Sequence, residues 1–126
     1  MTDPIQLTLP WPPSVNAMWR AIPRGKHCTS ILSKRGREYR EAAMIAIAAH
    51  NLTLRKLGGR LQVTLDLHPP TARKFDCDNY AKAIQDALTH GCVWDDDEQI
   101  DDLHILKHPR DKENPRVVVT ISELKP

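Results

Sequence analysis

Residues 61–67 read Leu61-Gln62-Val63-Thr64-Leu65-Asp66-Leu67, and this strict alternation of apolar and polar side chains predicts a β-strand with one buried face. Gly58-Gly59 turns the chain into the strand, and Pro69-Pro70 ends it. Upstream, Ser33 is a candidate cap for a helix over about residues 34–50. The face of that helix expected to be buried holds Tyr39, Ala42, Ala43, Ala46, Ile47 and His50.

The remaining elements complete a small α+β domain. Alternation predicts a strand over residues 5–9, and residues 14–32 read as a loop or a loosely paired hairpin. A second helix is expected over about 79–89, and two further strands over 99–107 and 116–121. The buried stripe of the second helix would hold Tyr80, Ala83, Ile84, Ala87 and Leu88. The order β-α-β-α-β-β predicts a single domain over 1–126, with a small mixed sheet and two main helices.

Composition narrows the class of protein. With 126 residues the chain fits one domain, and 40% hydrophobic with 27% charged residues is typical of a globular protein. No apolar run approaches the roughly 20 residues of a membrane helix, and the N-terminal stretch lacks the pattern of a secretory signal. Cys28, Cys77 and Cys92 are an odd number without a CxxC pair, which favours reduced thiols in a cytoplasm. A zinc site on Cys77, His90 and Cys92 fits no usual ligand spacing.

Charge is segregated along the chain although the net charge is only +2. Residues 20–40 hold seven Lys or Arg against one acid, whereas six of the eight residues 95–102 are acidic. The basic segment is either a solvated surface or a surface that contacts the phosphates of a nucleic acid. The candidates for phosphate contact are Arg20, Arg24, Lys26, Lys34, Arg35 and Arg37.

Asp76 and Asp78 are the first candidate site residues. In an extended segment their side chains would point to the same side with Cα atoms roughly 7 Å apart, within reach of one cation. Lys82 lies one helical turn beyond Asp78, and Asp86 continues that face. A purely structural interpretation makes Asp78 a helix cap and Lys82–Asp86 an exposed ion pair, but it leaves Asp76 unexplained.

The acidic run after Trp94 offers a third carboxylate. An EF-hand is excluded, because with Asp95 in first position the required Gly is Ile100 and the required Glu is Leu106. If the run is extended and Trp94 points inward, Asp95 and Asp97 face outward. Hard oxygen ligands beside a lysine suit magnesium, or manganese in its place, and phosphodiester hydrolysis needs that combination.

Phe75 and Lys74 precede the first of these acids. In an extended segment Phe75 would face away from Asp76 and pack on the core. At a bend Phe75 could instead stack on an unpaired base, which makes it a candidate for DNA contact. Lys74, beside it, is a further candidate for DNA contact.

These residues carry a resemblance to a known family. Asp76-Cys77-Asp78-Asn79, Lys82 and Asp86-Ala87-Leu88, followed by Gly91 and residues 94–100, resemble the RusA family of Holliday junction resolvases. The opening residues 9–16, Trp19-Arg20 and residues 36–40 are similar to the N-terminal half of the same family. The resemblance therefore covers nearly the whole chain.

The resemblance implies a small homodimeric endonuclease, often prophage-encoded, that acts in DNA recombination and repair. It would need Mg²⁺ and would nick two opposed strands of a four-way DNA junction symmetrically. By motif position, the essential acids and metal ligands fall on Asp76, Asp78 and Asp97, and the essential lysine on Lys82. Cys77 stands where the family often has Leu, and Asp95 where it often has Glu or an apolar residue. Two alternatives stay open: a less selective metal-dependent nuclease on branched DNA, and a non-catalytic DNA-binding protein.

Overall fold

A four-stranded mixed sheet forms the body of the protein in a computed structural model, which describes residues 4–50 and 56–124. The strands are β1 (Ile5–Pro10), β4 (Leu61–His68), β5 (Ile100–Lys107) and β6 (Arg116–Glu123), in the order β1-β6-β4-β5. β6 is antiparallel to β1 and β4, whereas β5 is parallel to β4. The α+β class and the mixed sheet expected from the sequence are confirmed.

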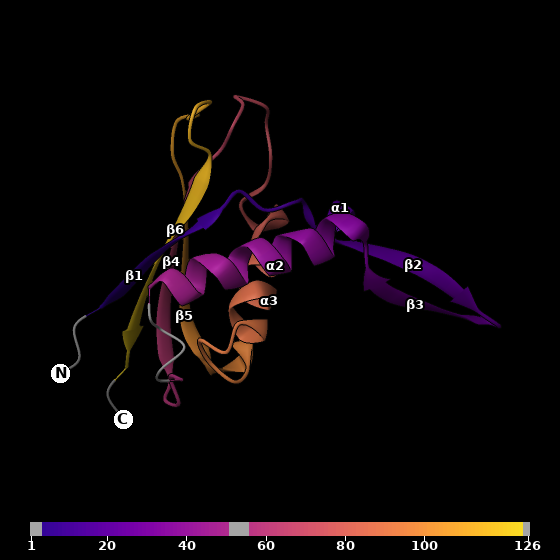
Figure 1. Cartoon of the computed structure of the whole chain (residues 1–126), viewed down its shortest axis with the longest axis horizontal. Helices are drawn as coiled ribbons and strands as arrows, with labels where there is room; N and C mark the ends of the chain where they lie inside the picture. Colours follow the sequence, from indigo (N-terminus) through magenta and orange to yellow (C-terminus); the bar gives the residue numbers. More distant parts are fainter. Residues whose placement is uncertain (1–3, 51–55, 125–126) are drawn as a thin grey trace.

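Two helices, α2 (Lys34–Ala49) and α3 (Ala81–His90), lie side by side over one face of this sheet (Figure 1). The Ser33 hydroxyl caps α2 as expected, because it accepts a hydrogen bond of 3.0 Å from the Gly36 N–H. Both helices bury apolar residues against the alternating inward side chains of β4. The predicted faces need one correction: Ala42 and His50 are exposed, because the buried face of α2 narrows to a stripe of Gly36, Tyr39, Ala43 and Ile47.

The N-terminal segment between β1 and α2 forms a hairpin, the more ordered of the two alternatives for residues 14–32. One helical turn, α1 (Val15–Met18), precedes β2 (Trp19–Arg24), which pairs antiparallel with β3 (His27–Leu32). Gly25 takes a positive φ of 61° in the tight turn between them. In Figure 1 the hairpin projects away from the sheet and is the most extended part of the molecule.

Two short 3₁₀ turns interrupt segments that the sequence predicted as extended or helical. These are η2 (Cys77–Asn79), directly before α3, and η3 (Asp97–Gln99), directly before β5. The second helix therefore begins at Ala81 rather than near residue 79. Within the described ranges, no helix combines the length and apolarity needed to cross a bilayer.

Candidate active site

An open pocket of about 510 Å³ lies where η2, α3, η3 and the edge strand β5 meet. Asp76, Asp78, Lys82 and Asp97 all line it, so the structure brings together the four residues that the sequence singled out. Leu103 and Ile105 of β5 add apolar wall, and Leu103 is 39% exposed although it is a large apolar side chain. The pocket combines three carboxylates, one ammonium group and a partly exposed apolar surface.

The first two acids reach the pocket from a turn rather than from a strand. Asp76 is extended, with φ −81° and ψ 147°, but Cys77–Asn79 coil into η2, and the Asn79 N–H donates to the Asp76 carbonyl at 3.0 Å. The alternation argument for Asp76 and Asp78 is therefore wrong in its premise, although both side chains line the same pocket. The capping interpretation of Asp78 is also wrong: Tyr80 occupies the N-cap position of α3, and no side chain caps it.

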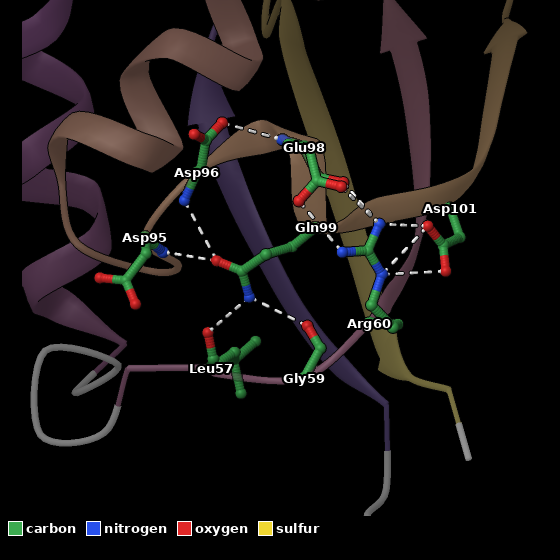
Figure 2. Close-up of polar contacts among 8 residues, drawn as sticks. All are labelled: Leu57, Gly59, Arg60, Asp95, Asp96, Glu98, Gln99 and Asp101. Carbon is green, nitrogen blue, oxygen red and sulfur yellow. Dashed lines mark hydrogen bonds and ion pairs between the residues drawn. The ribbon is translucent and has the colours of Figure 1, made fainter. Parts of the chain in front are cut away.

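Asp97 reaches the pocket from the second turn. Asp96 caps η3 by accepting a hydrogen bond of 3.0 Å from the Glu98 N–H (Figure 2). The Asp95 carboxylate forms an ion pair of 2.8 Å with Lys56. The extended geometry assumed for residues 95–97 is wrong, because Asp97 begins η3. Of the three consecutive acids, Asp97 is the one that lines the pocket.

Gln99 shapes this turn and was missed from the sequence. Its side-chain oxygen accepts from the backbone N–H groups of Asp95 at 2.8 Å and Asp96 at 3.1 Å (Figure 2). Its amide nitrogen donates to the carbonyls of Leu57 at 3.0 Å and Gly59 at 2.9 Å. Gln99 is buried, with 8% of its surface exposed, so one side chain ties the acidic turn to the segment that leads into β4. The available signal was the spacing Asp96-x-x-Gln99, which is that of a capping box.

Most other members of the acidic run have structural partners. The Arg60 guanidinium binds both Glu98 and Asp101, as Figure 2 shows. Asp102 accepts from the Gln62 side-chain amide at 2.7 Å. The run of six acids is thus not one cation site but a set of separate contacts around the turn that carries Asp97.

Asp97 lies in an environment that disfavours its negative charge. Burial is the largest cause, followed by the neighbouring Asp96 carboxyl group, and together they raise the pKa of Asp97. The charge of Asp86 adds a smaller contribution in the same direction. Asp86 itself is held by a two-pronged contact with Arg40, in which both nitrogen–oxygen distances are 2.9 Å. A cation beside Asp97 would offset this unfavourable electrostatic environment.

Lys82 lies over an aromatic ring instead of beside an acid. Its ammonium nitrogen is 5.1 Å from the ring centroid of Trp19, at the base of the hairpin. The expected Lys82–Asp86 ion pair is therefore wrong, because Asp86 pairs with Arg40 across α2 and α3. Lys82 also lines a neighbouring hollow with Arg20 and Ser30 of the hairpin, so it lies between the carboxylates and the base of the hairpin.

The donor set suits a hard divalent cation. Three aspartate carboxylates on one pocket wall are the oxygen ligands that Mg²⁺ or Mn²⁺ prefers. Throughout residues 4–50 and 56–124, however, no three acidic, imidazole or thiol side chains converge into a ready-made metal cluster. The carboxylates fit the ion by chemistry and by placement on one pocket, and their side chains would have to turn toward it.

Comparisons with known proteins identify the family of the chain. The family described as Endodeoxyribonuclease RusA matches residues 10–122. The chain belongs to the RusA family. It is 35% identical over 118 residues to the crossover junction endodeoxyribonucleases of Enterobacteria phage 82 and of Escherichia coli strain K12, covering 94% of this chain and 93% of each relative. The relative from Enterobacteria phage HK97 is 33% identical over 102 residues, which is 81% of either chain.

The basic residues of this RusA-family member lie outside the active-site pocket, and Arg20 is the one that shares a hollow with Lys82. Arg20 and Arg24 lie on β2 and Lys26 in the turn, while Lys34, Arg35 and Arg37 form the exposed first turn of α2. The hairpin and the start of α2 thus form one basic arm, defined by those six residues. Whether they contact DNA stays a prediction.

Phe75 and Lys74 line a neighbouring pocket rather than the active-site pocket. Phe75 is half-buried and packs edge-on against Trp11 and Tyr80, with ring centroids 6.0 and 5.2 Å away. The Lys107 ammonium nitrogen lies 4.6 Å from the centroid of the Phe75 ring and also donates to the Phe75 carbonyl. These contacts favour the packing role for Phe75, whereas Lys74 is exposed.

Proposed function

We propose that this protein is a magnesium-dependent endodeoxyribonuclease that resolves four-way DNA junctions by paired, symmetric nicks in recombination and repair. The observation that carries the proposal is the pocket lined by Asp76, Asp78, Asp97 and Lys82. Membership of a family of endodeoxyribonucleases supports it, as does the name crossover junction endodeoxyribonuclease given to relatives that cover nearly the whole chain. Two of these relatives come from phages, which is compatible with a prophage origin.

Asp76, Asp78 and Asp97 would hold the metal ion, which supplies activation of water and polarisation of the scissile phosphate when bound. Lys82 lies on the polar side of α3 and would offset the negative charge that develops on the phosphate oxygens. Contact with Trp19 restricts where the Lys82 ammonium group can go. Leu103 and Ile105 supply apolar surface beside these charged groups.

The basic arm would supply most of the affinity for DNA by contacting phosphates, so binding should weaken steeply with salt. Paired alanine substitutions in the arm should lower the slope of log affinity against log salt by about one per lost phosphate contact. Unchanged affinity and slope would place the DNA-binding face elsewhere.

A homodimer suits this reaction. A four-way junction has approximate two-fold symmetry, and an isologous dimer presents two equivalent sites to two equivalent strands. Sedimentation equilibrium with and without junction DNA measures this directly, and a protein that cleaves the junction while remaining monomeric contradicts the dimer.

The decisive experiment incubates the protein with a synthetic four-way junction, a flap and plain duplex, with Mg²⁺, Mn²⁺ or chelator. Paired symmetric nicks in the junction alone support the proposal. Cuts in every substrate indicate a less selective nuclease, and retarded but intact DNA indicates a binding protein.

Conservative variants test the site itself. Asp76→Asn, Asp78→Asn and Asp97→Asn should each abolish cleavage while junction binding survives, because the phosphate contacts lie elsewhere. Asp95→Asn is the matched control, since Asp95 pairs with Lys56, and it should stay active. Asp96→Asn should have intermediate activity because Asp96 caps η3. Near-normal cleavage by any of the first three variants would remove that residue from the site.

A further inference from the structure

A second pocket adjoins the active site and is used by nothing in the mechanism above. It has a volume of about 400 Å³, within the range of roughly 300–1,000 Å³ seen for small-ligand sites. Asn79 lines both pockets, because it follows Asp78 in η2. A group bound in the second pocket would therefore lie directly beside the reacting phosphate.

Aromatic rings form one wall of this pocket. The ring centroids of Trp11 and Tyr80 are 4.7 Å apart, and Phe75 packs edge-on against both. Lys107 lies over the Phe75 ring, so Phe75 acts as a support. Trp11 and Tyr80 are half-buried like Phe75, and they are the rings left to offer a stacking surface in the pocket. Stacking on aromatic rings is a common way for proteins to hold an unpaired nucleobase.

Polar groups line the rest of the pocket. Arg73 and Lys74 are exposed, and in the described part of the chain neither has a carboxylate within ion-pair distance. The side-chain amide of Asn79 and the hydroxyl of Tyr80 likewise make no hydrogen bond to any residue within 4–50 or 56–124. An aromatic surface, a free amide and two free cations match the three parts of a nucleotide: its base, the polar edge of that base and its phosphate.

We propose that this pocket binds one unpaired nucleobase next to the scissile phosphate and thereby sets the nucleotide preference of cleavage. The base stacks on Trp11 or Tyr80, the Asn79 amide hydrogen-bonds its edge, and Arg73 and Lys74 contact the adjoining phosphate. The inference rests on the proposed nuclease function and adds to it a specificity-determining residue, Asn79.

Photocrosslinking tests the pocket in the unmodified protein. Junctions that carry 5-iodouracil at one position each, on either side of the cut, are bound in chelator, irradiated and digested for mass spectrometry. Crosslinks to Trp11 or Tyr80 should peak at one or two neighbouring positions. If wild-type protein cleaves the junction with Mg²⁺ but neither residue crosslinks at any position, the pocket is overturned while the nuclease function stands. If it fails to cleave any DNA, the nuclease function itself fails.

Cleavage ratios test the role of Asn79. Across junctions that vary only in the two nucleotides flanking the cut, wild-type protein should prefer some at least 10-fold over others. Asn79→Ala should shrink that ratio several-fold. Lys34→Ala, on the basic arm, is the matched control and should slow all junctions alike. An Asn79→Ala protein that loses rate equally on every junction, or a wild-type protein without any preference, would contradict the inference.

Discussion

Replacing Gln99 by Leu tests how the acidic turn is held in place. The substitution keeps a side chain of similar size but removes four hydrogen bonds of 2.8–3.1 Å to the backbone of Asp95, Asp96, Leu57 and Gly59. A hydrogen bond contributes about 0.5–1.5 kcal/mol net, so four account for roughly 2–6 kcal/mol. Because the turn is at the surface, water can replace some of the lost hydrogen bonds. We therefore expect the free energy of unfolding to fall by about 2–4 kcal/mol.

Urea denaturation measures the stability loss, and a shift in midpoint at constant slope identifies it as a change in stability. For a domain of this size the melting temperature should fall by roughly 10 °C. The cleavage rate should also fall by more than the loss of folded protein explains, because Asp97 lies on the same turn. Gln99→Glu should be destabilised too at neutral pH, since a carboxylate would face the Leu57 and Gly59 carbonyls.

Arg60→Ala is the matched control for Gln99, because Arg60 contacts the same turn but its side chain is 45% exposed. It should cost less stability than Gln99→Leu and leave cleavage near wild type. A Gln99→Leu protein with less than about 1 kcal/mol lost and with normal cleavage would refute this account of the turn.

Three further predictions concern side chains of the hairpin and of α2. Trp19→Leu should slow cleavage at least several-fold, whereas Trp19→Phe should keep most of the wild-type rate, because a ring restrains the Lys82 ammonium group. Equal cleavage rates of the Leu and Phe variants in single-turnover assays would exclude that restraint. Arg40→Ala should lower the free energy of unfolding by about 1–3 kcal/mol, since it breaks a half-buried pair, and Lys34→Ala, which breaks an exposed one, should lower it less. Burial raises the pKa of Tyr39, so the folded state resists its ionisation; stability should be intact below about pH 10 and fall above it. Tyr39→Phe should show a shallower alkaline decline, and an identical decline would contradict this assignment.

The fold was predictable because its core elements carry strong periodic patterns. The alternation of residues 61–67 is confirmed, as are four of the five residues predicted for the buried stripe of α3, since burial on one face is what those patterns record. The fifth, Tyr80, is the N-cap of α3 and is half-buried. The hairpin β2–β3 was left open because its residues are mostly exposed, and an exposed ribbon needs no hydrophobic alternation. The single turn α1 is too short for its four residues to show a helical period.

The four residues singled out in the sequence line one pocket, but the backbone geometry that brings them there was not predicted, and the reason lies in the two 3₁₀ turns. Alternation placed Asp76 with Asp78, and Asp97 apart from Asp96, on the assumption of extended backbone, yet both segments coil. Each turn ends where a regular element begins, η2 before α3 and η3 before β5. The first turn brings Asp76 and Asp78 to the pocket, and the second brings Asp97. Local backbone preference could not reveal this, because Gln99 holds η3 through contacts with residues some 40 positions earlier. Gln99 therefore combines a local capping contact with long-range hydrogen bonds to Leu57 and Gly59. The acids and the local contact can be recognised in the sequence, whereas the long-range bonds that anchor the turn cannot.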